Sequence, residues 1–234
     1  MKTLVLNLSG PLQSWGVGSR FSRRSTQTEP SKSGVLGLLA AAQGRPREAS
    51  LDDLAALSLA VRVDMPGELV EDFHTARAPR SQSSNLSWRH YRSDAAYVAT
   101  VTGNDELVAG LSDALREPKF PLYMGRRSCP APLNLVGGLV DKGDAEEVLR
   151  DLSAAPWQAS EQYRKNAPTE VRLPIARDAR PGEIGESVYD VPVSFDPRHR
   201  KYDARIVVRP EPVLVRNEVG VKYADPFFQT VQEA

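Results

Sequence analysis

Basic side chains gather in three segments of the sequence that carry almost no acid. Residues 12–47 hold six arginines and lysines against Glu29 alone, and residues 73–93 and 118–140 hold four and three with no Asp or Glu. An arginine guanidinium matches the geometry of phosphate oxygens and can stack on planar bases. Because segregated charge can present one strongly basic face, the pattern predicts a surface that binds a phosphate-rich polymer. The alternative is a set of ordinary solvated loops.

Two short motifs within these segments have the residue types of a phosphate site. Gly125-Arg126-Arg127-Ser128-Cys129-Pro130 follows a predicted strand, so its glycine permits a sharp turn and its arginines can clamp phosphates. Ser31-Lys32-Ser33 precedes a predicted helix, whose free N–H groups attract anions. A nucleotide-binding P-loop is not expected, because Thr26 and Ser31 stand where that motif requires glycine. A basic turn and an ordinary serine cap are the alternatives.

Side chains that could catalyse RNA cleavage are few. The histidines His74, His90 and His199 lack the spacing of metal ligands, and no Ser-His-Asp order, HExxH motif or cysteine pair is present. His90 with Tyr91, or His199 with Lys201, could supply a general base and a general acid. Nothing in the sequence places these groups together, so catalysis is not expected.

Length and composition limit the class of protein. The chain has 234 residues with 41% hydrophobic and 26% charged side chains, which excludes a disordered chain, a collagen and a coiled coil. Its 30 basic and 30 acidic residues argue against a uniformly basic nucleic-acid binder. One cysteine, Cys129, allows no internal disulfide or cysteine-rich metal centre. Without a long apolar run or a signal peptide, the sequence predicts a cytoplasmic protein with no metal, cofactor or membrane partner.

Hydrophobic periodicity predicts an α+β fold. The predicted strands cover 2–8, 57–63, 69–76 continuing at 95–101, and 118–123. Helices are predicted from the Ser31 cap to Gly44 and from the Asn104 cap to Leu115. This β-α-β-β-α-β order is that of the ferredoxin-like fold, which the RNA-recognition module (RRM) also uses. The aromatic RNP1 signature of that module is absent, so an RNA surface on this RRM-like scaffold would be built differently.

Two further regions complete the predicted organisation. Residues 79–94 interrupt the third strand as a polar, Arg-rich hairpin, a projecting thumb inserted in a ferredoxin-like domain of residues 1–125. Residues 126–234 are expected to form an Arg-rich loop and a smaller β-rich C-terminal region. That region would contain a helix at 144–152, strands at 189–195 and 205–209, and a basic loop at 197–202.

Five blocks of the sequence, in order along the chain, resemble the CasD family. Members of this family cap the 5′ end of the guide RNA in Cascade, the type I-E CRISPR surveillance complex. The blocks are LSGPLQSWG at 8–16, PSKSGVLGLLAAAQG at 30–44, DFHT at 72–75, WRHYRSDA at 88–95 and YMGRRSCP at 123–130. The resemblance implies an RNA-binding fold of the repeat-associated RAMP group.

The resemblance also implies partners and a role in antiviral defence. The implied partners are the 5′ handle of the guide RNA (crRNA), a neighbouring Cascade backbone subunit and the large target-recognition subunit, with target DNA contacted only indirectly. The implied role is non-catalytic. A related CRISPR family that cuts its own precursor gives the alternative, a metal-independent endoribonuclease. A third alternative is an adaptor of this fold whose basic clusters bind only protein.

The resemblance, read together with the basic clusters, assigns RNA contacts residue by residue. The helix start and the arginines before it would hold handle phosphates, and the loop that follows Tyr123 would clamp them from the opposite strand end. The thumb aromatics would wedge or stack, and the thumb arginines would pair with phosphate or a flipped base. The expected RNA-binding residues are Gln13, Trp15, Arg20, Arg23, Arg24, Ser31, Lys32, Ser33, Arg80, Trp88, Arg89, Tyr91, Tyr123, Arg126 and Arg127.

Overall fold

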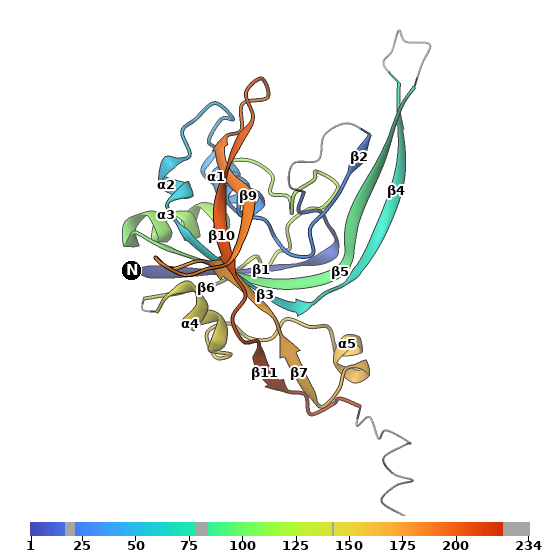
Figure 1. The fold of residues 1–234 in the computed structure, drawn as a ribbon, viewed down its shortest axis with the longest axis vertical. Coiled ribbons are helices and arrows are strands. Elements are labelled where there is room, and N and C mark those ends of the chain that lie inside the picture. Colours follow the sequence, from blue (N-terminus) through green and yellow to red (C-terminus); the bar gives the residue numbers. More distant parts are fainter. Residues whose placement is uncertain (17–21, 78–83, 142, 222–234) are drawn as a thin grey trace, which may run out of the picture.

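A single large sheet forms the centre of the computed structural model, which describes residues 1–16, 22–77, 84–141 and 143–221 (Figure 1). Its strands are β1 (Lys2–Gln13), β2 (Arg23–Arg24), β3 (Ser58–Met65), β4 (Glu68–Ala76), β5 (Asn85–Gly103), β6 (Val136–Val140), β8 (Ile175–Asp178), β9 (Glu186–Ser194) and β10 (Lys201–Val208). A separate two-stranded sheet pairs β7 (Glu170–Leu173) with β11 (Val213–Arg216). The helices are α1 (Lys32–Gln43), α2 (Asp52–Ala55), α3 (Asp105–Arg116), α4 (Ala145–Arg150) and α5 (Glu161–Asn166). The protein is therefore a mixed α/β structure with a large, mostly antiparallel sheet.

The strand order places the first strand inside the sheet, next to the edge strand β6. The order is β6-β1-β5-β3-β8-β10-β9, with β2 and β4 pairing with the outer part of β5. The central strands contribute side chains to two hydrophobic cores, because successive side chains point to opposite faces of a sheet. Leu4 and Leu6 pack in the core that contains α1 and α3, whereas Val5 packs with Leu149 of α4 on the other face.

The two long helices begin where the sequence predicts, and α1 also ends at the predicted residue. The Ser31 side chain caps α1 by accepting a hydrogen bond from the Gly34 N–H, and Gly44 ends the helix in the left-handed conformation. The Asn104 side chain caps α3 by accepting from the N–H groups of its first turn. The predicted starts of both helices and the C-cap of α1 are confirmed, since each rests on local capping chemistry.

The β4–β5 hairpin extends well beyond the body of the sheet (Figure 1). Its register runs from Glu68 opposite Ser93 to Ala76 opposite Asn85. Residues 85–94, predicted as part of a polar interruption at 79–94, are instead the first half of the single continuous strand β5. The tip of the predicted insertion, including Arg80, lies outside the described residues.

The predicted strand at 118–123 is wrong. Apart from one isolated bridge between Tyr123 and Pro130, the segment is irregular, and Lys119 and Phe120 donate their N–H groups to carbonyls at the end of α1. Prolines at 118 and 121 remove ladder donors, which disfavours a strand here. The fourth strand of the pattern is β6, which pairs with β1 and contains Gly137 and Gly138. The opening strand is also longer than predicted, since β1 runs to Gln13.

The C-terminal predictions at 189–195 and 205–209 are confirmed as the antiparallel pair β9 and β10. Through β8 this pair joins the same sheet as β1, and β6 also joins it from beyond residue 125. The division of the chain at residue 125 stays a prediction. The predicted helix at 144–152 is α4, which begins after an Asp144 capping box. No helix in the described part of the chain is long and apolar enough to cross a membrane.

Candidate nucleic-acid interface

The loop between Tyr123 and Pro130 is fixed against the end of β1. The Met124 N–H donates to the Cys129 carbonyl at 2.7 Å, which closes the loop on itself. The Ser14 N–H donates to the Met124 carbonyl at 3.1 Å, which attaches the loop to the strand. Gly125 takes φ 89°, a left-handed conformation, with the Ser14 carbonyl directly beside it. Because glycine alone adopts this conformation without a steric cost, its position in the motif has a backbone cause.

The Arg126 side chain connects its own loop to two strands, β5 and β2. Its guanidinium donates to the His90 carbonyl at 3.0 Å and to the Arg24 carbonyl at 2.7 Å, and lies 4.7 Å from the centre of the Tyr91 ring. These contacts join the loop to β5 and β2. Arg127, the second arginine of the predicted clamp, is exposed, and the described structure gives it no hydrogen bond or ion pair. The two neighbours therefore differ, since Arg126 fixes the loop and Arg127 is free to bind a ligand.

The predicted thumb residues lie on the β4–β5 hairpin in several environments. Trp88 is half-buried, with its ring centre 5.3 Å from that of Phe73 and 6.0 Å from the Arg23 guanidinium. Tyr91 is buried at the base of the hairpin. Arg89 is partly exposed and donates to Ser87 at 3.4 Å. On this hairpin the aromatic pair and the adjacent guanidinium form a surface for a planar or apolar partner.

Gln13 and Trp15 are structural residues. Trp15 is fully buried, and its indole N–H donates to the Gln13 side-chain oxygen at 3.0 Å. The Gln13 amide in turn donates to the carbonyls of Leu8 and Ala95. The Trp15 ring also fills the space beside Gly34 on α1. These contacts position α1 against β1, and the RNA contact predicted for the two side chains stays a prediction.

Lys32 is held by the protein's own carboxylates. Its Nζ donates to Asp178 at 2.9 Å, and its backbone N–H donates to Asp190 at 2.7 Å. Arg205 completes this buried ion cluster with bonds of 2.6 Å to each of the two carboxylates. The N-terminus of α1 does receive an anion, as the sequence predicts, but the anion is Asp190. Lys32 therefore has a structural role, and its predicted contact with an RNA phosphate stays a prediction.

The buried ion cluster makes stability sensitive to acid. Burial opposes ionisation of Asp178, but Lys32 and Arg205 outweigh it and hold the pKa of this carboxyl below its ordinary value of 3.8. A lowered pKa stabilises the fold fully above the ordinary value, and this contribution is lost as the pH falls through the folded value. We expect the unfolding free energy to fall below about pH 4, and to fall less steeply in Asp178→Asn. Urea unfolding between pH 3 and 7 measures both slopes, and equal slopes would contradict the assignment.

A groove with a volume of about 1140 Å³ runs beside α1. Six arginines line it, and among the described residues that line it there is no Asp or Glu: the arginines are Arg24, Arg45, Arg47, Arg126, Arg127 and Arg200. Small residues of α1, from Ser31 and Ser33 to Ala41, form part of its surface. Arg45 is engaged by Asp53 at 2.6 Å, whereas Arg47 is exposed without an ion pair in the described structure. The groove can therefore hold an anionic polymer close to a helix backbone.

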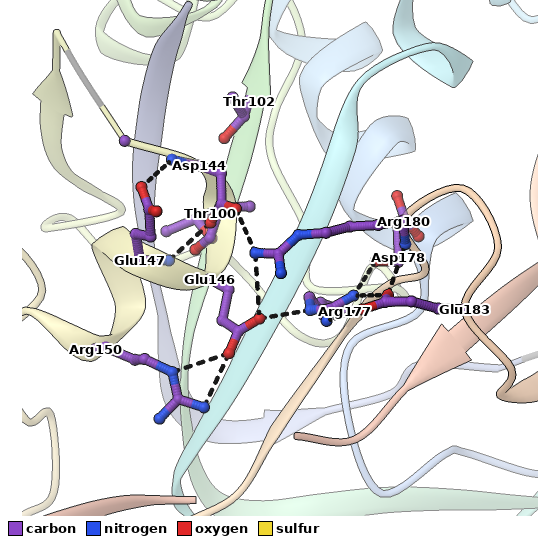
Figure 2. A network of polar contacts seen from close by, with 12 residues as sticks. Thr100, Thr102, Asp144, Glu146, Glu147, Arg150, Arg177, Asp178, Arg180 and Glu183 are labelled. Atoms are coloured by element: carbon purple, nitrogen blue, oxygen red, sulfur yellow. Dashed lines mark hydrogen bonds and ion pairs between the residues drawn. The ribbon is translucent and has the colours of Figure 1, made fainter. Parts of the chain in front are cut away.

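The second cluster of charged residues is internally paired. It joins α4 to β8 and to the loop that follows β8 (Figure 2). Arg177 donates to Glu146 at 2.6 Å and, through both terminal nitrogens, to Glu183, which lowers the pKa of Glu183 to about 2. Arg180 donates to Asp144 at 2.6 Å. A 620 Å³ cavity adjoins this cluster, but the paired charges leave it without a basic surface.

Comparison with known proteins shows which family this chain belongs to. A family model described as CRISPR-associated protein (Cas_Cas5) matches residues 3–208. The chain belongs to the Cas5 family of CRISPR-associated proteins. The match covers the loop at 125–130, α1 and, apart from Lys2, the whole of the large sheet. The resemblance of the five sequence blocks to the CasD family is thereby confirmed.

Individual relatives of this Cas5 chain agree with the family assignment. The CRISPR system Cascade subunit CasD of Escherichia coli (strain K12) is 31% identical over an alignment of 170 residues, and the match covers 62% of this chain and 75% of that protein. A solved structure described as a CRISPR RNA-guided surveillance complex matches with a TM-score of 0.74 at 30% identity, covering 99% of this chain and 98% of the other. Another, described as the crystal structure of a Cas protein, matches with a TM-score of 0.60 at 34% identity, covering 94% and 98%.

The remaining predicted site residues divide between the groove and other places. Ser31, Ser33 and Tyr123 line the groove with Arg24, while Arg23 lies against Trp88 on the hairpin. Arg20 lies outside the described residues. Sequence reasoning missed Phe120 and Phe195 as groove residues, because one was assigned to a strand and the other to a different region. An aromatic residue beside a basic loop was the available signal for each.

The histidines of this Cas5 protein do not form a shared site in the described structure. His90 pairs with Glu71 at 3.0 Å across the hairpin, and His74 pairs with Asp72 on β4. His199 lies in the exposed loop between β9 and β10. Among the described residues, no group of three or more His, Cys, Asp and Glu side chains could hold a metal ion.

Proposed function

We propose that this chain is a CasD-type subunit of a Cascade complex in CRISPR defence, and that its arginine-lined groove grips the 5′ handle of the guide RNA. The groove carries the proposal, because its described lining contains six arginines and no acid, and two of them, Arg47 and Arg127, are exposed without an ion pair in the described structure. Intramolecular carboxylates pair with Lys32 and Arg177, whereas Arg47 and Arg127 make no ion pair in the part of the chain that the structure describes. Free guanidinium groups pair with phosphate oxygens in charge-assisted bonds.

The scaffold supports this proposal. The strands β6-β1-β5-β3, connected through α1 and α3, have the order that a ferredoxin-like β-α-β-β-α-β fold gives. On that basis we assign the chain to the RAMP group. Its groove would lie along one side of α1, with the Gly125–Pro130 loop at one end. The protein would read shape and backbone, while guide–target pairing reads sequence.

The β4–β5 hairpin is the proposed thumb. It projects from the sheet and carries exposed apolar side chains, among them Leu69, Phe73 and Leu86. Such a surface fits a protein partner better than solvent. We assign it to the neighbouring Cascade backbone subunit, and the large target-recognition subunit would contact another face. Target DNA would be reached only through that assembly.

A double arginine variant tests the groove. Arg47→Ala with Arg127→Ala is expected to weaken binding of repeat-derived RNA by about 2–4 kcal/mol, because two charge-assisted contacts are lost. The slope of log affinity against log salt should fall by about one to two, since fewer counterions are released. Fluorescence anisotropy between 50 and 300 mM salt measures both quantities.

The matched control removes two exposed arginines from the small β7–β11 sheet, Arg172→Ala with Arg216→Ala. It makes the same change in net charge but leaves the groove intact, so its affinity should stay close to that of the wild-type chain. Equal losses in the two double variants would show that net charge, and not the groove, governs binding.

We propose that the subunit does not cut RNA. General acid–base cleavage needs a base and an acid within hydrogen-bond reach of the same phosphate. His90 is already paired with Glu71, and His199 lies in a loop of a different hairpin. Incubation of the chain with precursor repeat RNA in chelator should leave the RNA intact. Site-specific cleavage that disappears in His90→Ala or His199→Ala would establish the endoribonuclease alternative.

A further inference from the structure

The β9–β10 hairpin reaches the groove from a part of the chain far from the sequence motifs. Phe195 follows β9, Arg200 precedes β10 and Tyr202 lies in β10, yet all three line the groove with residues of α1. The ring of Phe195 lies 3.5 Å from where a Cβ on Gly37 would be. In Figure 1 this hairpin and the β4–β5 hairpin project in the same direction. The C-terminal hairpin therefore forms a second wall of the groove.

We infer that this hairpin is a base-stacking wall, in which Tyr202 and Phe195 stack the bases of a single-stranded RNA whose phosphates the groove arginines hold. The inference rests on the proposed function and deepens it by naming the RNA class and the residues that select it. Phe120 and Tyr123 line the groove from another segment. Aromatic rings on two segments beside arginines are the composition of a site for unpaired bases.

The second wall is held in a fixed position. Asp190 of β9 accepts from the Lys32 N–H at the start of α1, and Arg205 of β10 bonds both Asp190 and Asp178. Asp190 is only 1% exposed, so this cluster joins the hairpin to α1 from inside the protein. Packing of β9 against α1 and α2 adds to the attachment. A rigid support lets an aromatic ring bind a base without first being ordered.

Single-stranded RNA is the class that these side chains favour. In an RNA duplex the bases are already stacked and paired, so their faces are not available to protein aromatics. A single strand offers each base face to a ring, and base–aromatic stacking tolerates any sequence because every base has such a face. The groove should therefore prefer unpaired handle RNA to the same RNA annealed to its complement.

The experiment compares two tyrosines of the same hairpin. Tyr202 lines the groove, whereas Tyr189 lies further along the hairpin opposite Ala204, is 65% exposed and is not part of the groove lining. Full-length wild-type, Tyr202→Ala and Tyr189→Ala chains are titrated into fluorescent single-stranded repeat RNA and into its duplex. We expect Tyr202→Ala to weaken single-strand binding about 5- to 150-fold, the loss of one stacked base, and Tyr189→Ala to change it less than about twofold. Thermal unfolding of each variant establishes that it is folded.

A second variant keeps the test decisive if Tyr202→Ala fails to fold. Phe120→Ala removes a ring that is 48% exposed in the groove, and it should weaken single-strand binding in the same direction. Loss of binding in the Tyr202 or Phe120 variant, with preference for single strand in the wild type, supports the inference. Wild-type binding that neither variant weakens, or equal affinity for duplex, overturns the inference and leaves the proposed function intact. No binding of any RNA by the wild type overturns the proposed function itself.

Discussion

Gly125→Ala is expected to lower the free energy of unfolding by about 3 kcal/mol and to abolish tight binding of repeat RNA. An added Cβ would lie 1.7 Å from the Ser14 carbonyl oxygen, a distance that no small side-chain adjustment relieves because both groups are backbone. The residue also has φ 89°, which costs any L-residue with a Cβ about 1–2 kcal/mol. The loop must therefore move away from β1.

Movement of the loop would reach the groove through its neighbours. Arg126 would lose its bonds to the carbonyls of His90 and Arg24, and Arg127 would leave the groove. Chemical denaturation and RNA titration of the same sample measure the two effects. The control is Gly110→Ala in α3, where a Cβ meets nothing within 4 Å. Because alanine favours a helix over glycine by up to about 1 kcal/mol, that variant should be slightly more stable. A stable Gly125→Ala chain with wild-type affinity would contradict this account of the loop.

Elements with local signals were predictable from the sequence. Ser31 and Gly44 bound a helix because capping depends on residues within one turn. The pairing of 189–195 with 205–209 followed from alternation over a short connection. Signals that point to two structures at once were not reliable. The Gly137-Gly138 pair is typical of a turn but lies inside β6, and Phe120 with its neighbours has apolar character but is interrupted by prolines.

The site was predictable in its chemistry and only partly in its residues. The loop at 125–130 and the arginines of the groove follow from charge and glycine placement. The partner of the Lys32 ammonium group does not, because Asp178 lies 146 residues later and only the folded sheet brings it to α1. The sequence contains many carboxylates that could neutralise a given cation. Which arginines stay free for a ligand is therefore decided by tertiary structure.

Some basic residues pair with carboxylates inside the protein, and others remain on the surface of the groove. Lys32 and Arg205 pair with the carboxylates Asp178 and Asp190, which hold the C-terminal hairpin against α1. The groove beside that hairpin keeps arginines that no acid in its described lining opposes. Neutral net charge and a basic binding surface are compatible because the acids are placed where they pair internally.

Arg205→Met is the second substitution with a large expected effect. The Arg205 side chain is 13% exposed, and its loss leaves Asp178 and Asp190 with Lys32 as their remaining cation. Removing one member of a buried ion pair typically costs about 3–5 kcal/mol, because the remaining charge is desolvated without compensation. We expect a loss of that size in the unfolding free energy, and weaker RNA binding as the β9–β10 hairpin loosens. Urea unfolding and RNA titration measure the two effects.

Arg209→Met is the control that separates the effect of losing a buried charge from the effect of losing an exposed one. The Arg209 side chain is 50% exposed and pairs with Glu29 at 2.7 Å, so Arg209→Met should cost less than about 1 kcal/mol. A double variant, Arg205→Met with Asp190→Asn, removes the uncompensated carboxylate while Asp178 keeps Lys32. It should recover roughly half of the stability that Arg205→Met loses, since the two changes act on one cluster and are not additive. If the double variant is instead less stable than Arg205→Met by the full cost of Asp190→Asn alone, the two residues are independent and the cluster does not hold the hairpin.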